Sequence, residues 1–405
     1  MTTIDALRDG AQALAPSLVR VRRALHQHPE VGLELPRTQE TVLSELDGLG
    51  LEITTGTSTT SVTAVLRGGG PGPSVLLRAD MDGLPIGEQT GLAFASVESG
   101  AMHACGHDLH TAMLIGAAKL LSEHRDLLHG DVVFMFQPGE EGWDGAAHML
   151  REGVLDAAGT RVSSAYGIHV MANTDRGIFT TRPGILMAAS AALSLRVRGA
   201  GGHGSSPHNA KDPITVAAQI IGDLQTVVTR RFDIFDPVVI SVGRIEAGAT
   251  RTIIPDEVAI EGTVRTFSNA AQDRAEEAIT RACKHIGAAY EVEVDVTFRH
   301  EYPATMNHPD HAAFVEELVS DSFGPERFRT MASPRPGSED FSRVIAEVPG
   351  CYLMLGARVA ADGEAVPDNH STHVQFDESV LPDGTLLHAR VAVEALLRDA
   401  APVPA

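Results

Sequence analysis

Three short apolar runs, each followed at once by polar residues, constrain the fold of this chain more than any other feature. The runs are Ser74–Ala79, Asp131–Phe136 and Arg161–His169. Strands that are apolar on both faces are typical of parallel sheets covered by helices on both sides. Open α/β sheets build their sites just beyond the carboxyl ends of such strands. We therefore expect an α/β fold with functional groups along one edge of a sheet.

The stretch MHACGHDLHT at Met102–Thr111 concentrates metal-binding side chains directly before an apolar run of helical character. Its donors are His103, Cys105, His107 and His110. Thiolates and neutral imidazoles bind zinc and similar ions, and a helix N-terminus is expected to lower the pKa of the Cys105 thiol. Asp108 is alternatively the N-cap of a helix over Leu109–Glu123. This stretch alone is compatible with either a metal site or a plain helix start.

Length, charge and cysteine content limit the class of protein. At 405 residues with 43% hydrophobic side chains, the chain is long enough for two domains. Its net charge of −21 argues against a nucleic-acid partner. The three cysteines, an odd number spaced far apart, make no disulfide framework and favour a cytoplasmic location. No apolar run reaches the roughly 18 residues needed to span a bilayer, so no membrane association is expected.

The segment from 187 to 300 has a different pattern from the rest of the chain. We predict strands and helices there in the order β-α-β-β-α-β, which is the ferredoxin-like arrangement. Asp212 followed by Pro213 is expected to begin the first of its helices. The division is therefore a first part of a catalytic domain at 1–186, an inserted domain at 187–300, and a second catalytic part at 301–405.

Further metal-ligand side chains follow the other predicted strands. Glu140 and Glu141 come after one strand, His169 ends the next, and His370 lies near the C-terminus. Each taken singly is more often structural than functional. Together with the Cys105 stretch they form a set large enough for two metal ions about 3.5–4 Å apart. Glu140 would then be free to accept a proton from the attacking water.

With these motifs the sequence resembles the dinuclear metal-dependent amidohydrolases, which include aminoacylases, hippurate hydrolases and plant auxin-conjugate hydrolases. The resemblance covers nearly the entire chain. It rests on HQHPEVGLE, LLRADMDGLPI, MHACGHDLHTA, FMFQPGEEG, GIHV, GAGGHGSSPHNAKDPI, IIPDEV, EGTVRTF, GSEDFS and NHSTH. It implies a metallopeptidase-like catalytic domain with a central mixed sheet, plus an inserted ferredoxin-like domain that acts as a lid and in dimerisation.

The resemblance also implies roles for the catalytic-domain residues. Two divalent ions, which could be zinc, manganese, cobalt or nickel, would be held by Cys105, His107, Glu141, His169 and His370. The Cys105 thiolate would bridge them. Glu140 would act as general base and then as proton donor to the leaving amine. Asp82 and Asp108 would orient ligand imidazoles through their N–H groups, or would instead be simple cap or turn residues.

In the inserted domain the resemblance implies three further residues. His203 corresponds to a histidine that stabilises the tetrahedral oxyanion in the site of a partner subunit. Arg265 is similar to the residue that holds a substrate carboxylate, although a surface ion pair is the plain alternative. Thr252 stands where relatives often have asparagine, so the substrate-binding group differs there.

We therefore predict a cytoplasmic, homodimeric enzyme that hydrolyses the amide bond of small N-acyl amino acids or dipeptides. Two alternatives stay open. The first is a metal-dependent protein that binds acyl amino acids without turning them over. The second is a hydrolase that uses Cys105 as a covalent nucleophile.

Overall fold

The computed structural model describes residues 3–360 and 364–400, and the chain divides into two compact units. The large unit consists of Met1–Leu186, Met306–Ser333 and Asp340–Ala405. The small unit consists of Met187–Thr305 and Pro334–Glu339. Each unit has its own hydrophobic core.

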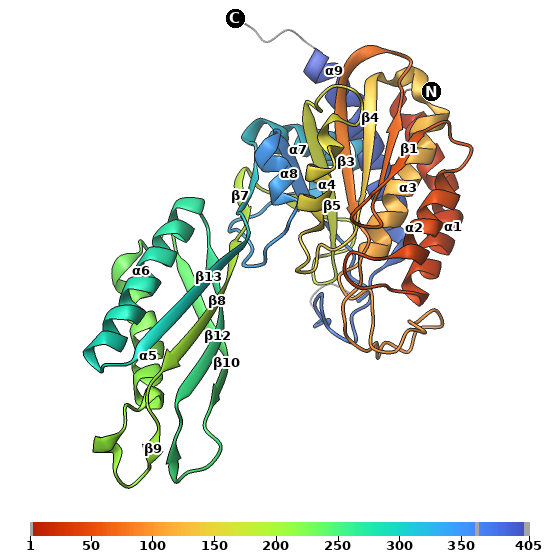
Figure 1. Ribbon diagram of the computed structural model, residues 1–405. Helices are drawn as coiled ribbons and strands as arrows, with labels where there is room; N and C mark the ends of the chain where they lie inside the picture. The colour runs from red at the N-terminus through yellow and green to blue at the C-terminus, as the bar shows by residue number, and fades with distance from the viewer. Residues whose placement is uncertain (1–2, 361–363, 401–405) are drawn as a thin grey trace, which may run out of the picture. The chain divides into compact units, whose positions relative to one another are not determined.

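The large unit is built on one eight-stranded mixed sheet (Figure 1). In spatial order its strands are β1 (Glu52–Thr55), β2 (Val62–Leu66), β4 (His129–Gln137), β3 (Gly70–Asp80), β5 (Ser164–Met171), β16 (Gly350–Gly356), β6 (Phe179–Thr181) and β15 (Phe328–Thr330). The four central strands β4, β3, β5 and β16 run parallel, and β2 and β6 join them antiparallel. The predicted α/β fold with a central mixed sheet is confirmed.

Helices cover both faces of this sheet. They are α1 (Thr3–Gln27), α2 (Pro36–Leu46), α3 (His107–Glu123), α4 (Gly145–Arg151), α7 (Pro309–Phe323), α8 (Ser342–Glu347) and α9 (Leu381–Ala400). Helices α1, α3 and α9 pack on one another, and α3 and α9 also contact β3. Helices α4 and α8 contact each other and reach β4 and β5, respectively. Two short strands, β7 (Gly184–Met187) and β14 (Thr305–Asn307), complete the assignment outside the small unit's own sheets.

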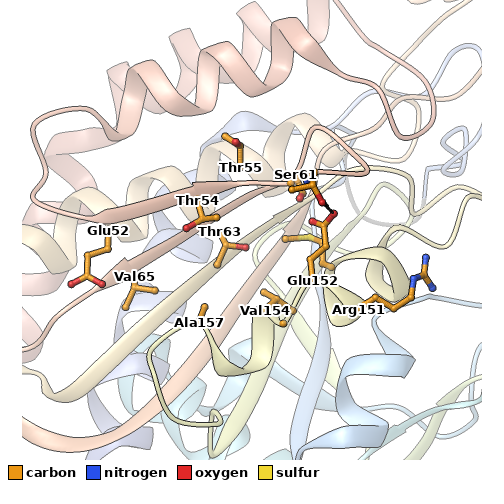
Figure 2. Close-up of a pocket in the computed structure, with 14 residues that line it drawn as sticks. Glu52, Thr54, Thr55, Ser61, Thr63, Val65, Arg151, Glu152, Val154 and Ala157 are labelled. Atoms are coloured by element: carbon orange, nitrogen blue, oxygen red, sulfur yellow. Dashed lines mark hydrogen bonds between the residues drawn. The ribbon is translucent and has the colours of Figure 1, made fainter.

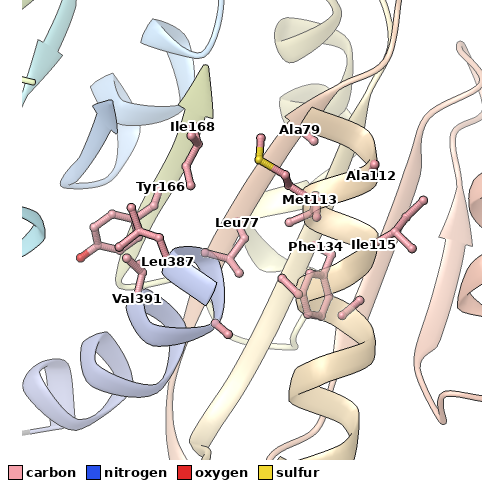
Figure 3. Packing of buried hydrophobic residues seen from close by; sticks show 14 of the residues in the cluster. Leu77, Ala79, Ala112, Met113, Ile115, Phe134, Tyr166, Ile168, Leu387 and Val391 are labelled. Atoms are coloured by element: carbon pink, nitrogen blue, oxygen red, sulfur yellow. The ribbon is translucent and has the colours of Figure 1, made fainter. Parts of the chain in front are cut away.

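Side chains alternate along β3, so one face of this strand is apolar and the other is charged. Leu77 and Ala79 are buried with Met113 of α3 and Leu387 of α9 (Figure 3). Arg78, between them in sequence, points to the opposite face because successive strand residues alternate. One face of β3 is therefore hydrophobic core, and the other carries a buried charge.

The small unit is a four-stranded antiparallel sheet with two helices on one face. Its spatial order is β10 (Val238–Ala247), β12 (Glu257–Thr266), β8 (Ala189–Arg198) and β13 (Glu293–Tyr302), with helices α5 (Pro213–Arg231) and α6 (Asn269–Ala289). Two short strands, β9 (Gly202–His203) and β11 (Ile253–Ile254), pair separately. The order β8-α5-β10-β12-α6-β13 confirms the predicted ferredoxin-like arrangement. Asp212 caps α5 as predicted, since its side chain accepts a hydrogen bond from Ile214 N at 2.9 Å.

The predicted start of the helix after the cysteine stretch is wrong. Helix α3 begins at His107, two residues earlier than expected, and its N-cap is Gly106. Gly106 has a left-handed φ of 88°, which a glycine adopts at little cost. Asp108 consequently lies inside the first turn and is fully buried instead of capping the helix.

None of the described helices combines the length and the apolar character that crossing a bilayer requires.

The buried face of β3 gives a direct test of the core. Leu77→Ala is expected to lower the free energy of unfolding of the large unit by about 2–5 kcal/mol, because Leu77 has no exposed surface. Leu397→Ala is the matched control, since Leu397 on α9 is 46% exposed and should cost no more than about 0.5 kcal/mol. Urea unfolding followed by circular dichroism measures both. Equal losses would contradict the described packing.

Candidate metal centre

The five predicted metal ligands come together at the carboxyl ends of the parallel strands. Cys105 Sγ lies 3.4 Å from His169 Nε2 and 3.2 Å from His370 Nε2. His370 Nε2 is in turn 3.1 Å from Glu141 Oε1. These four side chains come from the loop before α3, from β5, from the loop before α9 and from the loop after β4, and the fifth, His107, is the first residue of α3. The topology thus joins residues that are up to 265 positions apart.

Two groups of donor atoms share Cys105. One contains Cys105, His107 and His169, the other Cys105, Glu141 and His370, and within each group the donor atoms all lie within 4.8 Å of one another. A third group joins His107 to Glu140 and Glu141 under the same limit. Two neighbouring cation sites with one thiol in common are therefore compatible with the arrangement.

The chemistry of these atoms fits divalent metal ions. Both ring nitrogens of His107 and Oε1 of Glu141 are buried, and none of them makes a hydrogen bond of good geometry among the described residues. Their nearest polar neighbours are Asp80, Asp82 and His370, at 3.1–3.5 Å. Buried polar atoms almost always have a partner, so such a group calls for a ligand of its own. A thiol, three imidazoles and carboxylates form a donor set typical of zinc and related ions.

Asp82 and Asp108 have different surroundings. Asp82 accepts hydrogen bonds from Glu140 N at 3.0 Å and Glu141 N at 3.1 Å, and its Oδ1 lies 3.4 Å from His107 Nδ1. It therefore holds the Glu140–Glu141 turn beside the imidazole of His107. Asp108 lies 2.7 Å from His26 Nδ1 and 2.8 Å from Arg22 Nε. Its described contacts are thus with residues outside the five predicted ligands.

The surroundings of Cys105 act against the expected thiol ionisation. Burial raises the pKa of the Cys105 thiol, and the Glu141 carboxylate adds to that effect. His107 and His370 lower it in part. The prediction that the helix N-terminus would lower this pKa is therefore wrong when only the protein's own groups act on the thiol. Burial takes the thiolate out of water, and this desolvation is the largest effect. A bound cation would supply the missing stabilisation of the thiolate.

His370 is held in place by an unusual backbone. Its φ is 70°, in the left-handed region that non-glycine residues seldom adopt. Its main-chain N donates to Ala104 O at 2.9 Å, next to Cys105. Hydrogen bonds to Cys105 and to Glu141 raise the pKa of His370 to about 10. Such backbone strain is found where the surrounding structure fixes a functional side chain.

A second buried layer lies behind the candidate ligands and contains His110, one of the donors noted in the Cys105 stretch, in a role that the sequence did not predict. His110 Nδ1 is 2.5 Å from Asp80 Oδ1, and Val170 N donates to His110 Nε2 at 2.7 Å. Because the main-chain N–H can only donate, Nδ1 carries the imidazole proton and donates it to Asp80. Asp80 Oδ2 also lies 3.5 Å from His107 Nε2. Asp80 and His110 thus connect β3, α3 and β5. His107 lies on α3 and His169 on β5, close to these contacts.

Arg78 balances the charge of this layer. Its guanidinium donates to Asp80 Oδ2 at 2.6 Å, Gln137 Oε1 at 3.0 Å and Asp340 Oδ1 at 3.1 Å, and it is 1% exposed. Burial alone would raise the pKa of the Asp80 carboxyl, but Arg78 together with His107 and His110 holds it well below its usual range. The spacing Arg78-x-Asp80 on one strand was the only available sequence signal for this pair.

The three predicted residues of the small unit do not form one cluster. His203 pairs with Ile253, and Thr252 O accepts from Gly204 N at 2.8 Å, so His203 and Thr252 lie together at the β9–β11 ladder. The ladder is followed closely in sequence by β12, which begins at Glu257. Arg265 lies eight positions further along this strand, which corresponds to a length of about 26 Å. Its Nη1 donates to Thr263 Oγ1 at 2.5 Å, and burial lowers the pKa of its guanidinium.

A separate cavity of about 470 Å³ lies in the large unit, between β1–β2 and the segment that follows α4 (Figure 2). Thr54 and Thr63 line one side, and Val154 and Ala157 line the other. Glu152 at its end is already engaged by Thr57 N and Ser58 N. No predicted site residue is among the described residues that line it, so its size alone does not indicate function.

Comparison with known proteins gives the family. Residues 76–394 match Peptidase family M20/M25/M40. The chain belongs to this family. The resemblance derived from the motifs is confirmed, and this M20 family member is a metal-dependent hydrolase of the peptidase and amidohydrolase type. The donor groups described above support two divalent ions.

Individual M20-type relatives cover almost the full chain. Thermostable carboxypeptidase 1 of Saccharolobus solfataricus is 36% identical over 400 residues, which is 97% of this chain and 99% of the relative. IAA-amino acid hydrolase ILR1-like 2 of Arabidopsis thaliana is 37% identical over 381 residues, 94% of this chain and 85% of the relative. The crystal structure of Bacillus subtilis YxeP, a dinuclear metal binding peptidase from the M20 family, has a TM-score of 0.81 at 32% identity, with coverage of 95% and 99%.

The N-cap of α3 allows a test of the ligand geometry. A Cβ at Gly106 would lie 2.3 Å from Val170 Cγ2, so Gly106→Ala is expected to displace His107 or the end of β5 and to lower metal affinity at least about tenfold. Gly100→Ala is the matched control, since Gly100 has φ 81° with no atom within 4 Å of a Cβ. It should cost about 1 kcal/mol of stability and leave metal binding unchanged. The metal content of each variant after dialysis, measured by plasma mass spectrometry, tests this expectation. An equal loss of metal from both variants would refute the close contact at Gly106.

Proposed function

We propose that this chain hydrolyses the amide bond of N-acyl amino acids and releases the free amino acid. The observation that carries the proposal is the convergence of Glu140 with the five candidate ligands around Cys105. Relatives named IAA-amino acid hydrolase and N-acetyl-L-cysteine deacetylase support this class of substrate. The substrate would be a small molecule.

The five candidate ligands would hold two divalent ions, and Cys105 belongs to both groups of donor atoms. They are Cys105, His107, Glu141, His169 and His370. When bound, such ions polarise an amide carbonyl and lower the pKa of a coordinated water. Sulfur favours zinc, whereas the mixed nitrogen and oxygen donors also suit manganese, cobalt and nickel.

Glu140 would move the proton that amide cleavage requires. It is 6% exposed, and Asp82 fixes its main-chain N, so its carboxylate has a defined place beside His107. We propose that Glu140 accepts a proton from the attacking water and then delivers it to the amide nitrogen. The C–N bond breaks as the nitrogen gains that proton, and the amine leaves neutral.

Residues of the small unit would bind the rest of the substrate. Arg265 would engage the substrate carboxylate through two parallel N–H bonds, and the Thr252 hydroxyl would contribute a further hydrogen bond. His203 would donate to the oxyanion that forms on the carbonyl. Within one chain His203 lies on the separate β9–β11 ladder, whereas Arg265 lies near the far end of β12, which supports their acting in different active sites.

This separation motivates the proposed assembly. We propose a homodimer that forms through the inserted domain, residues 187–300, between catalytic parts at 1–186 and 301–405. Strands β10 and β13 are the edges of the described small-unit sheet, and unpaired edges favour strand pairing between chains. The three cysteines are unbonded and buried, which supports a reducing, cytoplasmic location.

Two other functions share part of this geometry. A protein that binds acyl amino acids without turnover would use the same ligands but would have no need of Glu140. A hydrolase with Cys105 as nucleophile would need only the thiol and one imidazole as base, so the Glu140–Glu141 pair beside them would have no evident role. The arrangement therefore favours a metal-dependent hydrolase.

Glu140→Gln should separate chemistry from metal binding. Loss of the proton acceptor is expected to reduce kcat at least about 100-fold, while two ions per chain are retained. Glu40→Gln, at an exposed position on α2, makes the same chemical change and should leave kcat unchanged. Steady-state hydrolysis of N-acetyl and N-benzoyl amino acids, read by mass spectrometry, measures the effect. Wild-type kcat in the Glu140 variant would refute the proposed base.

Metal removal distinguishes the three functions. Protein stripped by a chelator should lose hydrolysis and regain it with zinc or manganese. Hydrolysis that survives complete stripping would assign the reaction to Cys105 as nucleophile. Substrate binding by the restored protein without any turnover would identify a binding protein.

Mixing two inactive chains tests the role of His203. Glu140→Gln and His203→Ala homodimers should each be inactive. In a mixed dimer one site would combine an intact Glu140 with the intact His203 of the other chain, so random exchange should restore about a quarter of wild-type activity. Activity assays before and after exchange measure this. Absence of recovery in dimers shown by native mass spectrometry to be mixed would contradict a contribution across chains.

A further inference from the structure

Trp143 is the only tryptophan of the chain, and it stands two positions after Glu141, one of the candidate metal ligands. It follows the tight turn in which Gly142 N donates to Glu140 O at 2.7 Å. Gly145 N donates to Gly139 O at 3.1 Å and closes the loop around it. Two residues of chain span at most about 7 Å, so the Cα of Trp143 lies within that distance of the Cα of Glu141.

One side of the indole rests on glycine backbone. A Cβ at Gly32 would lie 3.2 Å from Trp143 Cε2 and 3.5 Å from Cδ2, so the ring sits directly on that residue. Val31 forms a bridge with Gly83, and Gly83 N donates to Glu30 O at 2.7 Å. Gly83 follows Asp82, the carboxylate that holds the Glu140–Glu141 turn. The support of the ring is thus fixed to the same segment as the candidate catalytic turn.

The rest of the indole faces solvent. Trp143 is 54% exposed, which is unusual for so large an apolar side chain. It takes part in none of the ring or cation contacts found among the described residues. A rigid aromatic surface with one supported side and one open side is suited to stacking with a flat group in offset geometry.

We propose that Trp143 determines acyl-group specificity, by stacking on a flat aromatic acyl group of the substrate. This inference rests on the proposed hydrolysis of N-acyl amino acids. Because the acyl carbon is attached directly to the amide bond that is cut, its substituent must lie within a few ångströms of the Glu140–Glu141 turn. The indole is the large apolar surface that follows this turn in the chain. An acetyl group is too small to stack on it.

The kinetic test compares acyl groups in the metal-loaded, full-length enzyme. Trp143→Ala should lower kcat/KM for an N-benzoyl amino acid about tenfold, mainly through KM, and change it less than about twofold for the N-acetyl counterpart. Trp143→Phe retains an aromatic face and should keep most of the benzoyl preference. Leu397→Ala, which truncates a 46% exposed apolar side chain on α9 of the large unit, is the matched control. It should alter neither substrate.

An equal loss for both acyl groups in Trp143→Ala, with Trp143→Phe equally impaired, would show a structural role and overturn the proposal. Unchanged kinetics in Trp143→Ala would overturn it too while leaving the proposed hydrolysis intact. If the wild-type enzyme cleaves neither substrate, the proposed function fails, and intrinsic fluorescence then decides. Because Trp143 is the single tryptophan, saturable quenching by the N-benzoyl but not the N-acetyl amino acid would support stacking. No change with either would overturn it.

Discussion

The parallel pairing of β3 with β4 and β5 is the interaction on which the candidate metal centre depends. Main-chain hydrogen bonds set Asp80 opposite Gln137 and Arg78 opposite Gly167. The carboxyl ends of parallel strands lie at the same edge of a sheet. The residues that follow each strand are therefore neighbours in space, although they are distant in sequence. Asp82, the Glu140–Glu141 turn and His169 thereby come within contact of helix α3, which carries His107.

Charge at this edge is balanced in two layers. Cys105, His107, Glu141, His169 and His370 form the outer layer, and Asp80, Arg78 and Asp340 lie behind it. A carboxylate as deeply buried as Asp80 is stable only beside positive charge, which Arg78 provides. Asp80 is therefore free to fix the imidazoles of His110 and His107 in position. The ion pairs and hydrogen bonds of the inner layer thus stabilise a cluster of titratable side chains that is buried next to the hydrophobic core.

Sequence patterns predicted the central strands, the order of elements in the small unit and the family. Those inferences depend on local properties: apolar runs, turn residues and ordered motifs. The start of α3 was missed because Asp108 matches a capping preference, whereas a left-handed Gly106 makes the actual start. The direction of the pKa shift of Cys105 was missed as well, because it depends on burial by residues distant in sequence. The roles of Arg78 and His110 were not predicted. Apart from the Arg78–Asp80 spacing on β3, they depend on partners distant in sequence, such as Asp340 for Arg78 and Asp80 for His110.

The sequence by itself determined the identity and order of the candidate metal-ligand side chains, and the family of the chain, because these are properties of residue type and spacing. Only the tertiary structure decided which atoms meet. It placed His370 against Cys105 across 265 positions, gave Asp82 and Asp108 different partners, and put Arg265 and His203 on different sheets of the small unit. Pairing register and burial are collective properties of the folded chain, and no local pattern specifies them.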